Sequence, residues 1–436
     1  MNADAVPSIT PSRTVVTSFT PHKPSLSSVG NSTAVREGNA NGNGNGDWVL
    51  CAAASSNSGN NTKSHAQEET VSCALSNGQI QVYDQERLHR INSFQQQSSS
   101  IVNDLIYGPQ HCLVSAANNG QVAVWDLRQA GGAVLQSSIP AGQEALSVSV
   151  GFDGYLAAVA SNKSRIHFMD LRQAGSNSSN NVMGSYVDAH TMEVTQVRFQ
   201  PYSTILLSAA EDGLACVFDT TQPTEDAALK SVWNVGSAVR RAGFCGPDLS
   251  VVYCLTGSET ASIWHWDSAT CRQDFGGHAL RYRLAQSIPQ HKSQSMAIDY
   301  LVDAHWDCVN HELLLMAGSA TGDAALFRLG SNHADFEPCR LLKSGHGGIV
   351  RTWCPLSSSS SGKLITAGED ARLCEWNLAT DAATNDISCT LEPLHTPTLS
   401  APDRLAATGR SVAPMTGEEN SLRPPKRPKQ SRPPPY

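Results

Sequence analysis

Two segments of this chain repeat a histidine, a hydroxyl residue and an aspartate, the side chains that hydrolases combine for nucleophilic catalysis. The two sets are His190, Ser208 and Asp212, and His346, Thr366 and Asp370. In both sets the aspartate follows the hydroxyl residue by four positions and precedes an aromatic residue by six. A protein needs a catalytic triad once, whereas a structural network recurs in each repeat. The duplicated spacing therefore favours a buried hydrogen-bond network over a nucleophile.

The aromatic residue decides how far each network extends. Trp376 offers an indole N–H to Thr366, whereas Phe218 has no such donor, so we expect the first network to end at Ser208. These sets resemble the buried tetrads of WD-type repeats, in which the aspartate contacts the histidine, the histidine the hydroxyl and the hydroxyl the tryptophan. Two further segments hold weaker sets, which are Ser115, Asn119 and Trp125, and Thr256, Thr260 and Trp266.

A second repeated string, Asp-Leu-Arg-Gln-Ala-Gly, begins at Asp126 and again at Asp170. It places Arg128 and Arg172 at equivalent points of two consecutive repeats, so both should leave the same side of the fold. An arginine suits an interface anchor because its planar fork makes several directional bonds. The alternative is that each arginine only pairs with the aspartate two residues before it.

The segment 113–128 resembles the WDxR box of substrate receptors for cullin-4 ubiquitin ligases. In that family the arginine inserts into the DNA-damage-binding adaptor. The resemblance makes Asp126, Arg128, Asp170 and Arg172 candidate adaptor-binding residues. The sequence departs from the box at Asn119, where an acid is usual, and the second copy has methionine in place of tryptophan.

These residues recur because the chain is built from repeats. Seven bulky residues are spaced 42 to 61 positions apart, and they are Tyr83, Trp125, Met169, Phe218, Trp266, Phe327 and Trp376. A period of roughly 40–45 residues with a Trp-Asp signature marks a four-stranded propeller blade. Seven blades close a ring that leaves no long exposed sheet edge. The predicted fold is an all-β, seven-bladed WD40 β-propeller.

The repeat also sets the domain boundaries. Residues 1–46 form a low-complexity N-terminal segment, 47–380 the propeller, and 381–436 a disordered, proline-rich basic tail. We expect blades near 48–84, 101–129, 145–173, 188–220, 237–268, 300–330 and 345–378. The stretch 269–296 reads as an insertion, either a functional loop or a plain connector.

Ring closure needs one strand from outside the repeats, because the third strand of the last blade ends near residue 378. The β-branched island 13–19 is the best-patterned candidate, and 387–391 is the alternative.

Two further surfaces are candidates for partner binding. The loops that lead into first strands form a rim, and its exposed members are expected to be Met192, Glu193, Gly347, Gly348 and Ile349. Five basic residues without acids lie in the tail, and they are Arg423, Lys426, Arg427, Lys429 and Arg432. Such a run is typical of nuclear import or RNA contact, the alternative being a solvated terminal charge run.

Several strings resemble one family, WD repeat-containing protein 89. They are 194–199 with 211–213 and 217–219, 367–371 with Leu373 and Trp376, 83–88, and 225–227. The resemblance implies a seven-bladed propeller without enzymatic activity that acts as a scaffold. It also implies, for plant members, an association with growth and with ribosome-biogenesis partners.

Composition limits the remaining possibilities. Net charge is −8 and 16% of residues are charged, which argues against non-specific nucleic-acid binding by the body of the protein. The 12 cysteines form no CxxC pair, so we expect core thiols in a reducing compartment. No apolar run suits a signal peptide or a membrane span. We expect a monomer without cofactor or metal, in the nucleus, the cytoplasm or both.

Two functions remain from the sequence. The first is a non-catalytic protein-interaction scaffold, with a cullin-4 substrate receptor as its specific form. The alternative is a nuclear assembly factor in ribosome biogenesis that acts through protein and RNA contacts.

Overall fold

The structure is a computed structural model. It describes residues 8–9, 13–16, 48–55, 69–96, 100–108, 111–129, 131–151, 153–172, 182–276, 279–288, 296–329, 335–356 and 362–378. The chain divides into two units, 1–390 and 391–436, and every described residue belongs to the first.

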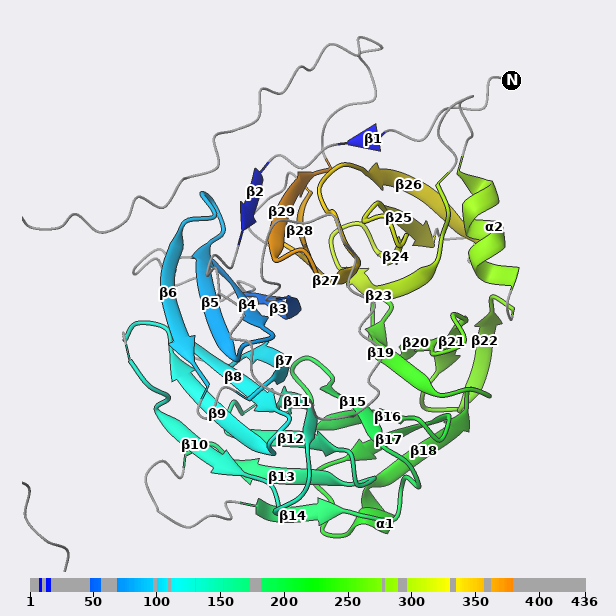
Figure 1. Cartoon of the computed structure of the whole chain (residues 1–436). Helices are drawn as coiled ribbons and strands as arrows, with labels where there is room; N and C mark the ends of the chain where they lie inside the picture. The colour runs from blue at the N-terminus through cyan, green and yellow to red at the C-terminus, as the bar shows by residue number, and fades with distance from the viewer. Residues whose placement is uncertain are drawn as a thin grey trace, which may run out of the picture. The chain divides into compact units, whose positions relative to one another are not determined.

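Seven sheets, antiparallel apart from one short edge strand, are arranged in a ring around a central axis, which confirms the seven-bladed β-propeller (Figure 1). Blades 1 to 3 contain β3 (Val49–Ala54), β4 (Thr70–Leu75), β5 (Gln79–Asp84) and β6 (Arg90–Gln95); β7 (Val102–Tyr107), β8 (Cys112–Ala117), β9 (Gln121–Asp126) and β10 (Leu135–Ser138); and β11 (Ala145–Val150), β12 (Leu156–Ser161), β13 (Ile166–Asp170) and β14 (Val182–Tyr186). Blades 4 and 5 contain β15 (Val194–Phe199), β16 (Ile205–Ala210), β17 (Leu214–Asp219) and β18 (Leu229–Asn234); and β19 (Val239–Cys245), β20 (Val251–Thr256), β21 (Ala261–His265) and β22 (Thr270–Asp274). Blades 6 and 7 contain β23 (Tyr300–Asp307), β24 (Glu312–Gly318), β25 (Ala324–Leu329) and β26 (Phe336–Leu342); and β27 (Val350–Pro355), β28 (Lys363–Gly368) and β29 (Arg372–Asn377). The described residues contain two helices: α1 (Glu225–Ala228) lies between the third and fourth strands of blade 4, and α2 (Ala279–Ser287) follows blade 5 in the chain.

The same tight turn joins the second and third strands in several blades. In blade 2, Asn119 accepts a hydrogen bond from the backbone N–H of Gln121 at 3.0 Å, and Gly120 has φ +80°. A Cβ at Gly120 would lie 2.5 Å from the carbonyl oxygen of Gln143, so both the backbone angle and the space require glycine. Asn-Gly and Asp-Gly pairs thus set where the second strand ends and the third begins.

The core consists of apolar clusters between neighbouring blades, not of one central core. One cluster joins blade 1 to blade 7, where Leu75 and Tyr83 pack with Ile365 and Leu373. Six other clusters join the remaining neighbours in turn. Each blade is therefore stabilised by burial on both of its faces, and the first and last blades close the ring.

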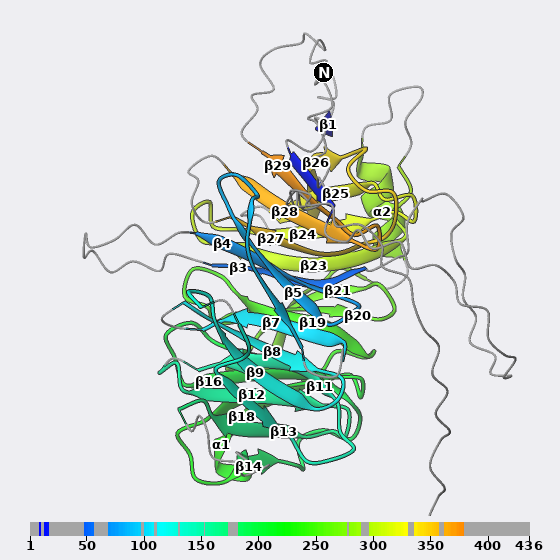
Figure 2. The same ribbon diagram turned by 60° about the vertical axis from the view of Figure 1, so that its left-hand side comes forward.

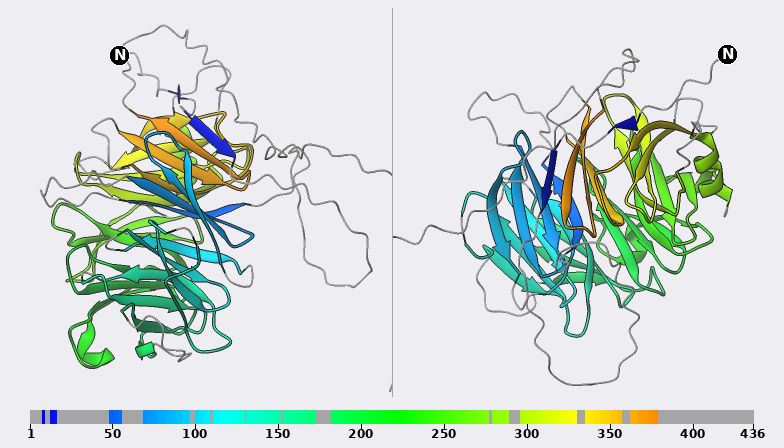
Figure 3. Two further views of the ribbon diagram at one scale, coloured as in Figure 1. Left: turned by 90° about the vertical axis from the view of Figure 1, so that its left-hand side faces the viewer. Right: turned by 45° about the horizontal axis from the view of Figure 1, so that its top comes forward.

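An N-terminal strand completes the last sheet. Strand β2 (Arg13–Val16) pairs antiparallel with β29, with Thr14 opposite Cys374, at the outer position for which the sequence predicts a closing strand. The dark blue strand lies beside the orange strands of blade 7 in Figure 3. A second short strand, β1 (Ser8–Ile9), pairs parallel with β26 and is labelled near it in Figure 2. Residues 17–19 of the predicted strand, and the alternative 387–391, lie outside the described residues.

The stretch 269–296 is not a simple insertion. It begins with β22, the outer strand of blade 5, which pairs with β21. It continues into α2; Leu280 and Leu284 of this helix, and Ile288 directly after it, are buried in the cluster between blades 5 and 6. The long spacing between signature residues thus reflects a fourth strand and a packed helix that the sequence prediction did not separate.

The predicted signature residue of blade 5 is wrong by two positions. In blade 7, Trp376 lies opposite Leu364, ten residues after Thr366. The equivalent pair in blade 5 is Trp264 opposite Val252, ten residues after Cys254. Trp266 lies beyond the end of β21, and its indole donates to the carbonyl of Leu249 at 3.0 Å.

The strand directions define two faces of the ring. The upper face carries the loops that lead into the inner strands and the turns between second and third strands, as Val194 opposite Ala210 illustrates. The lower face carries the turns between first and second strands and the ends of the third strands, as Asp219 opposite Ile205 illustrates.

Candidate functional site

The predicted tetrad of blade 7 is present as a continuous hydrogen-bond chain. The indole of Trp376 donates to Oγ1 of Thr366 at 2.7 Å, and Nε2 of His346 lies 2.7 Å from the same oxygen. Nδ1 of His346 lies 3.0 Å from Oδ1 of Asp370, whose Oδ2 accepts from the N–H of Gly347 at 2.8 Å. This chain of hydrogen bonds connects the third strand of blade 7 to its second strand, and the second strand to the loop that precedes its first strand.

Electrostatics favour this arrangement. Burial alone lowers the pKa of His346, but hydrogen bonds to Asp370 and Cys374 outweigh burial and raise this pKa to about 9. Burial alone raises the pKa of Asp370, and the bond from His346 reverses the effect and lowers it. The two side chains therefore form a charge-assisted hydrogen bond that stabilises the fold. Each side chain supplies the hydrogen-bond partner of the other in a site that water barely reaches.

Blades 4 and 2 contain shortened versions. In blade 4, Nε2 of His190 lies 2.7 Å from Oγ of Ser208, while Nδ1 lies 3.3 Å from Oδ2 of Asp212. Its network ends at Ser208, as the sequence predicts. In blade 2, the indole of Trp125 donates to Ser115 at 2.9 Å, and Ser115 donates to Gln96 at 3.3 Å.

Blade 2 thus has a glutamine where blades 4 and 7 have a histidine. The amide of Gln96 donates in turn to Gln121 at 2.9 Å. The sequence pattern does not reveal Gln96, because the spacing of the other tetrads predicts a histidine there. The position could have been found as a polar residue four to six places before an inner strand.

The hydroxyl groups of these networks are unsuited to nucleophilic catalysis. Ser208 and Thr366 are both 0% exposed, so a substrate carbonyl cannot approach either oxygen. Each hydroxyl contacts a histidine, and in blade 7 also a tryptophan. The geometry supports the structural interpretation over the catalytic one.

The two Asp-Leu-Arg boxes have matching geometry at the lower face. Arg128 donates from Nε and Nη2 to the two carboxylate oxygens of Asp126, at 2.9 and 2.8 Å. Arg172 does the same to Asp170, at 3.0 and 2.8 Å. The aspartate side chains are only 7% and 8% exposed, whereas the arginine side chains are 63% and 62% exposed. Each box is a buried acid that holds an exposed guanidinium.

The boxes also differ in one contact, an aromatic ring beside the second arginine. The hydrogen bond from Arg128 is the main reason that the pKa of Asp126 falls to about 2. In blade 3, the guanidinium of Arg172 lies over the ring of Tyr155, 5.2 Å from its centre, and Tyr155 is 41% exposed. The sequence prediction missed Tyr155, which lies in the turn between the first and second strands of the same blade.

The predicted partner-facing rim lies on the upper face, opposite the boxes. Met192 is 49% exposed, and Glu193 and Gly347 are also exposed, whereas Gly348 and Ile349 are half-buried. Burial and the carboxylates of Glu211 and Glu144 raise the pKa of Glu193. The predicted rim residues thus belong to two different blades, 4 and 7, of the upper face. The five predicted tail residues, 423–432, lie outside the described residues.

One acidic residue fixes the loop that carries His190. The carboxylate of Glu225, the first residue of α1, accepts the backbone N–H groups of Val187, Asp188 and Ala189 at 2.6 to 3.0 Å. In the sequence, 225–227 is only one of the strings that carry the family resemblance. Its structural role is to hold the chain as it enters blade 4.

A half-buried ion pair joins three inner strands. Nη1 of Arg198 on β15 donates to Oδ2 of Asp104 on β7 at 2.9 Å, and Ser147 on β11 donates to the same oxygen at 2.7 Å. Burial alone raises the pKa of Asp104, but Arg198 reverses this and lowers it. Blades 2, 3 and 4 are therefore linked near the axis as well as through their apolar clusters.

Comparison with known proteins agrees with this architecture. Residues 182–219, which include most of blade 4, match the family model described as WD domain, G-beta repeat. The chain is similar in fold to a chain from the crystal structure of a mitotic checkpoint complex, with a TM-score of 0.56 and 14% identity over 71% of this chain and 88% of that one. The fold and the repeated tetrads thus define a WD40-repeat propeller, a class that generally provides interaction scaffolds.

Two curated relatives narrow the family. The chain is 30% identical over 291 residues to WD repeat-containing protein GTS1 of Arabidopsis thaliana, covering 62% of this chain and 68% of that protein. It is 23% identical over 309 residues to the WD repeat-containing protein 89 homolog of Dictyostelium discoideum, covering 70% and 79%. The chain belongs to the WD repeat-containing protein 89 family. Among the described residues, neither helix has the length and apolar character needed to cross a bilayer.

Proposed function

We propose that this chain is a non-catalytic protein-interaction scaffold that serves as a substrate receptor of a cullin-4 ubiquitin ligase. Arg128 and Arg172 would dock on the DNA-damage-binding adaptor. The observation that carries the proposal is the paired geometry of the boxes. In each, a nearly buried aspartate holds an arginine that is more than three-fifths exposed.

Fixed arginines make better anchors than free ones. A free arginine loses rotamer freedom when a partner binds it, whereas the bidentate bond to aspartate has already removed much of that freedom. The bond uses Nε and Nη2, so the other donors of the fork are on the side away from the carboxylate. Those donors can bind acceptors of the adaptor.

Blade 3 adds an aromatic surface to the same patch. Tyr155 packs under Arg172, and Tyr202 in the next turn of the lower face is 73% exposed. Tyrosine and arginine are the residues in which interface hot spots are enriched. The exposed tyrosines and arginines on the lower face of blades 2 to 4 therefore favour a protein interface there.

Binding of the purified adaptor, measured by biolayer interferometry, tests the proposal. Arg128→Ala should weaken binding by about tenfold or more, because truncation of a central interface arginine has effects of that size. Arg172→Ala should weaken it less, since blade 2 has the fuller box. Arg128→Lys should also weaken binding, because lysine cannot reproduce the fork.

The matched control is Arg328→Ala. Arg328 lies near the end of a third strand, β25, is 48% exposed and pairs with Glu312 and Glu337, but it belongs to blade 6 and has no Asp-Leu-Arg string. Its replacement should leave adaptor binding unchanged. No adaptor binding by the wild-type protein at micromolar concentration would end the ligase proposal.

The second candidate function is nuclear assembly of ribosomal particles. It rests on the five basic residues of 423–432, which contain no acid and are interrupted by prolines. Replacement of these five residues by glutamine should abolish salt-sensitive RNA association and reduce nuclear accumulation of a fluorescent fusion. An unchanged RNA affinity and an unchanged distribution would exclude this candidate.

A further inference from the structure

Each inner strand has a β-bulge near its start, at the second residue in six strands and at the third residue in β23. The pairing skips one position in all seven inner strands, and the skipped residues are Leu50, Asn103, Leu146, Thr195, Arg240, Val302 and Arg351. A bulge redirects its side chain away from the sheet and is frequent near binding sites. These seven residues therefore occupy equivalent positions around the upper end of the ring.

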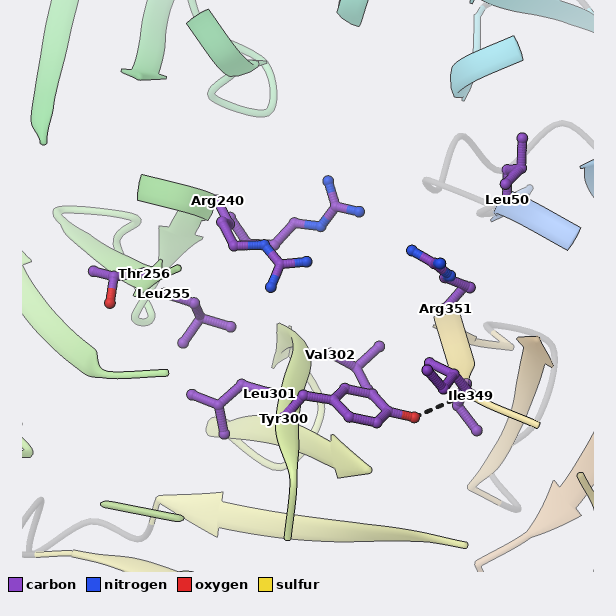
Figure 4. A pocket seen from close by; sticks show the side chains of 11 residues that line it. Leu50, Arg240, Leu255, Thr256, Tyr300, Leu301, Val302, Ile349 and Arg351 are labelled. Carbon is purple, nitrogen blue, oxygen red and sulfur yellow. Dashed lines mark hydrogen bonds between the residues drawn. The ribbon is translucent and has the colours of Figure 1, made fainter. Parts of the chain in front are cut away.

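A cavity of about 300 Å³ opens beside four of them. Its walls come from blades 1, 5, 6 and 7, and the bulge residues Leu50, Arg240, Val302 and Arg351 contribute to it. Figure 4 shows Arg240 and Arg351 on opposite sides, with Tyr300 and Val302 between them. The hydroxyl of Tyr300 accepts the N–H of Val350 at 2.8 Å and so ties the inner strands of blades 6 and 7 together.

The lining of the cavity is rich in arginine although the protein as a whole is acidic. Of the eleven lining residues three are arginines, namely Arg240, Arg241 and Arg351, and none is acidic. Their side chains are 58%, 40% and 42% exposed. The net charge of the chain is −8, so overall charge does not explain this concentration of arginine.

Each arginine has an acidic neighbour that does not line the cavity. Arg240 lies 3.5 Å from Glu259 and Arg241 lies 3.7 Å from Asp303, both long contacts.

These two acids are also engaged elsewhere. The N–H of Leu301 donates to Glu259 at 2.5 Å, and Tyr253 donates to Asp303 at 3.2 Å. Only Arg351 has a close pair, with Glu369, at 2.8 Å from Nε. The arginines are thus partly neutralised and still able to bind an anion.

We propose that this cavity binds a peptide segment of a partner protein in which an aspartate or glutamate lies next to an aliphatic residue. The carboxylate would lie between Arg240, Arg241 and Arg351, where planar forks make paired hydrogen bonds to carboxylate oxygens. The aliphatic side chain would pack on Leu50, Leu255 and Ile349, which line the same cavity.

Two features favour a carboxylate over a phosphate. The three neighbouring acids offset much of the arginine charge, which suits a monoanion better than a dianion. The walls are also partly aliphatic, and desolvation of apolar surface is favourable for a peptide side chain but offers nothing to a free phosphate. The volume is at the low end of ligand pockets, which fits one or two side chains.

The test uses a random peptide library displayed on phage and selected on the full-length protein. Selected peptides should be enriched in Asp or Glu next to Leu, Ile or Val. The strongest peptide is then synthesised in three forms, with the acid, with the matching amide and with phosphoserine, and each is measured by fluorescence anisotropy. The acid form should bind about tenfold or more tightly than the amide form, and more tightly than the phosphoserine form.

Arg351→Gln and the Arg240→Gln, Arg241→Gln double variant should each reduce affinity by about tenfold or more. Arg272→Gln, an exposed arginine on the outer strand of blade 5, is the matched control and should have no effect. If Arg351→Gln lowers the melting temperature, Arg351→Lys keeps the charge and should still weaken binding. A library without acidic enrichment, equal loss in the Arg272 control, or tighter binding of the phosphoserine form would overturn the proposal.

This site is independent of the adaptor proposal. Arg128 and Arg172 lie on the lower face, so their double alanine variant should bind the acidic peptide with wild-type affinity. Failure of either proposal therefore leaves the other unaffected.

Discussion

Removal of Asp370 should destabilise the propeller by an amount that the contacts of its carboxylate predict. The carboxylate accepts from His346 at 3.0 Å, from the N–H of Gly347 at 2.8 Å and from the N–H of Arg372 at 3.2 Å. Asp370→Ala exposes the two backbone groups to water near the surface, but His346 is only 6% exposed and loses its partner. One unsatisfied buried donor costs ~1–3 kcal/mol, so we expect a loss of about 2 kcal/mol.

The related blades give a graded comparison. Asp212→Ala in blade 4 should cost less than Asp370→Ala, because the bond from His190 is longer at 3.3 Å and its network lacks a tryptophan. Asn119→Ala in blade 2 should cost least, ~1 kcal/mol or below, because Asn119 accepts from the N–H of Gln121 and the histidine position is filled by Gln96. The expected order of destabilisation is Asp370, Asp212, Asn119.

Urea unfolding followed by tryptophan fluorescence measures these differences, and calorimetry checks them. The midpoint should fall in the stated order while the slope of the transition stays constant, since the surface exposed on unfolding does not change. A loss of about 2 kcal/mol should lower the melting temperature by a few degrees. An Asp370→Ala variant with a wild-type midpoint, or the reverse order among the three, would refute the view that the tetrad stabilises its blade.

Three other predictions concern ring closure, a turn and acid stability. Deletion of residues 1–16 should lower the melting temperature, because it removes the strand that pairs with β29; an unchanged melting temperature would contradict this. Gly120→Ala should destabilise more than Gly142→Ala, since both have positive φ but only Gly120 has a carbonyl 2.5 Å from the added Cβ, and equal melting temperatures would count against the packing argument. Burial alone raises the pKa of Asp212, but the His190 bond and backbone N–H groups outweigh it and lower this pKa to about 2. Its stabilisation is therefore present above pH ~4 and is lost as the pH falls towards 2, so the difference in melting temperature between wild type and Asp212→Asn should close over that range, and a constant difference would exclude the assignment.

The sequence predicted the blades well because a blade is a local unit. Second and third strands such as Thr70–Leu75 and Gln79–Asp84 are adjacent in the chain, are joined by Asn77-Gly78, and are buried on both faces. The tetrads were readable for the same reason, since His346 and Trp376 are only 30 positions apart. When contacting residues are close in the sequence, the pattern of residue types is enough to predict the contact.

The outer strands and one signature residue could not be placed in this way. In β6 one residue of six is buried, so the apolar alternation that marks a strand is missing. Trp264 and Trp266 differ by two positions, and residues two apart on a strand point to the same side. Only the pairing register, with Trp264 opposite Val252, distinguishes them. Helix α2, by contrast, had a readable signal in Leu280, Leu284 and Ile288, which recur at every fourth position.

The two candidate binding surfaces, the Asp-Leu-Arg boxes and the cavity on the upper face, also differ in how far they can be predicted from the sequence. Each Asp-Leu-Arg box lies within three consecutive residues, so its string is visible and its geometry follows from one aspartate and one arginine. The cavity on the upper face draws Leu50, Arg240 and Arg351 from positions 301 residues apart at the extremes, and they meet only because the ring closes between blades 1 and 7. No local pattern marks them, since Leu50, Arg240 and Arg351 share only a bulge position that is defined by strand pairing. In a propeller, a surface formed by one blade can be predicted from a local sequence pattern. A surface formed by several blades around the axis can be identified only from the structure.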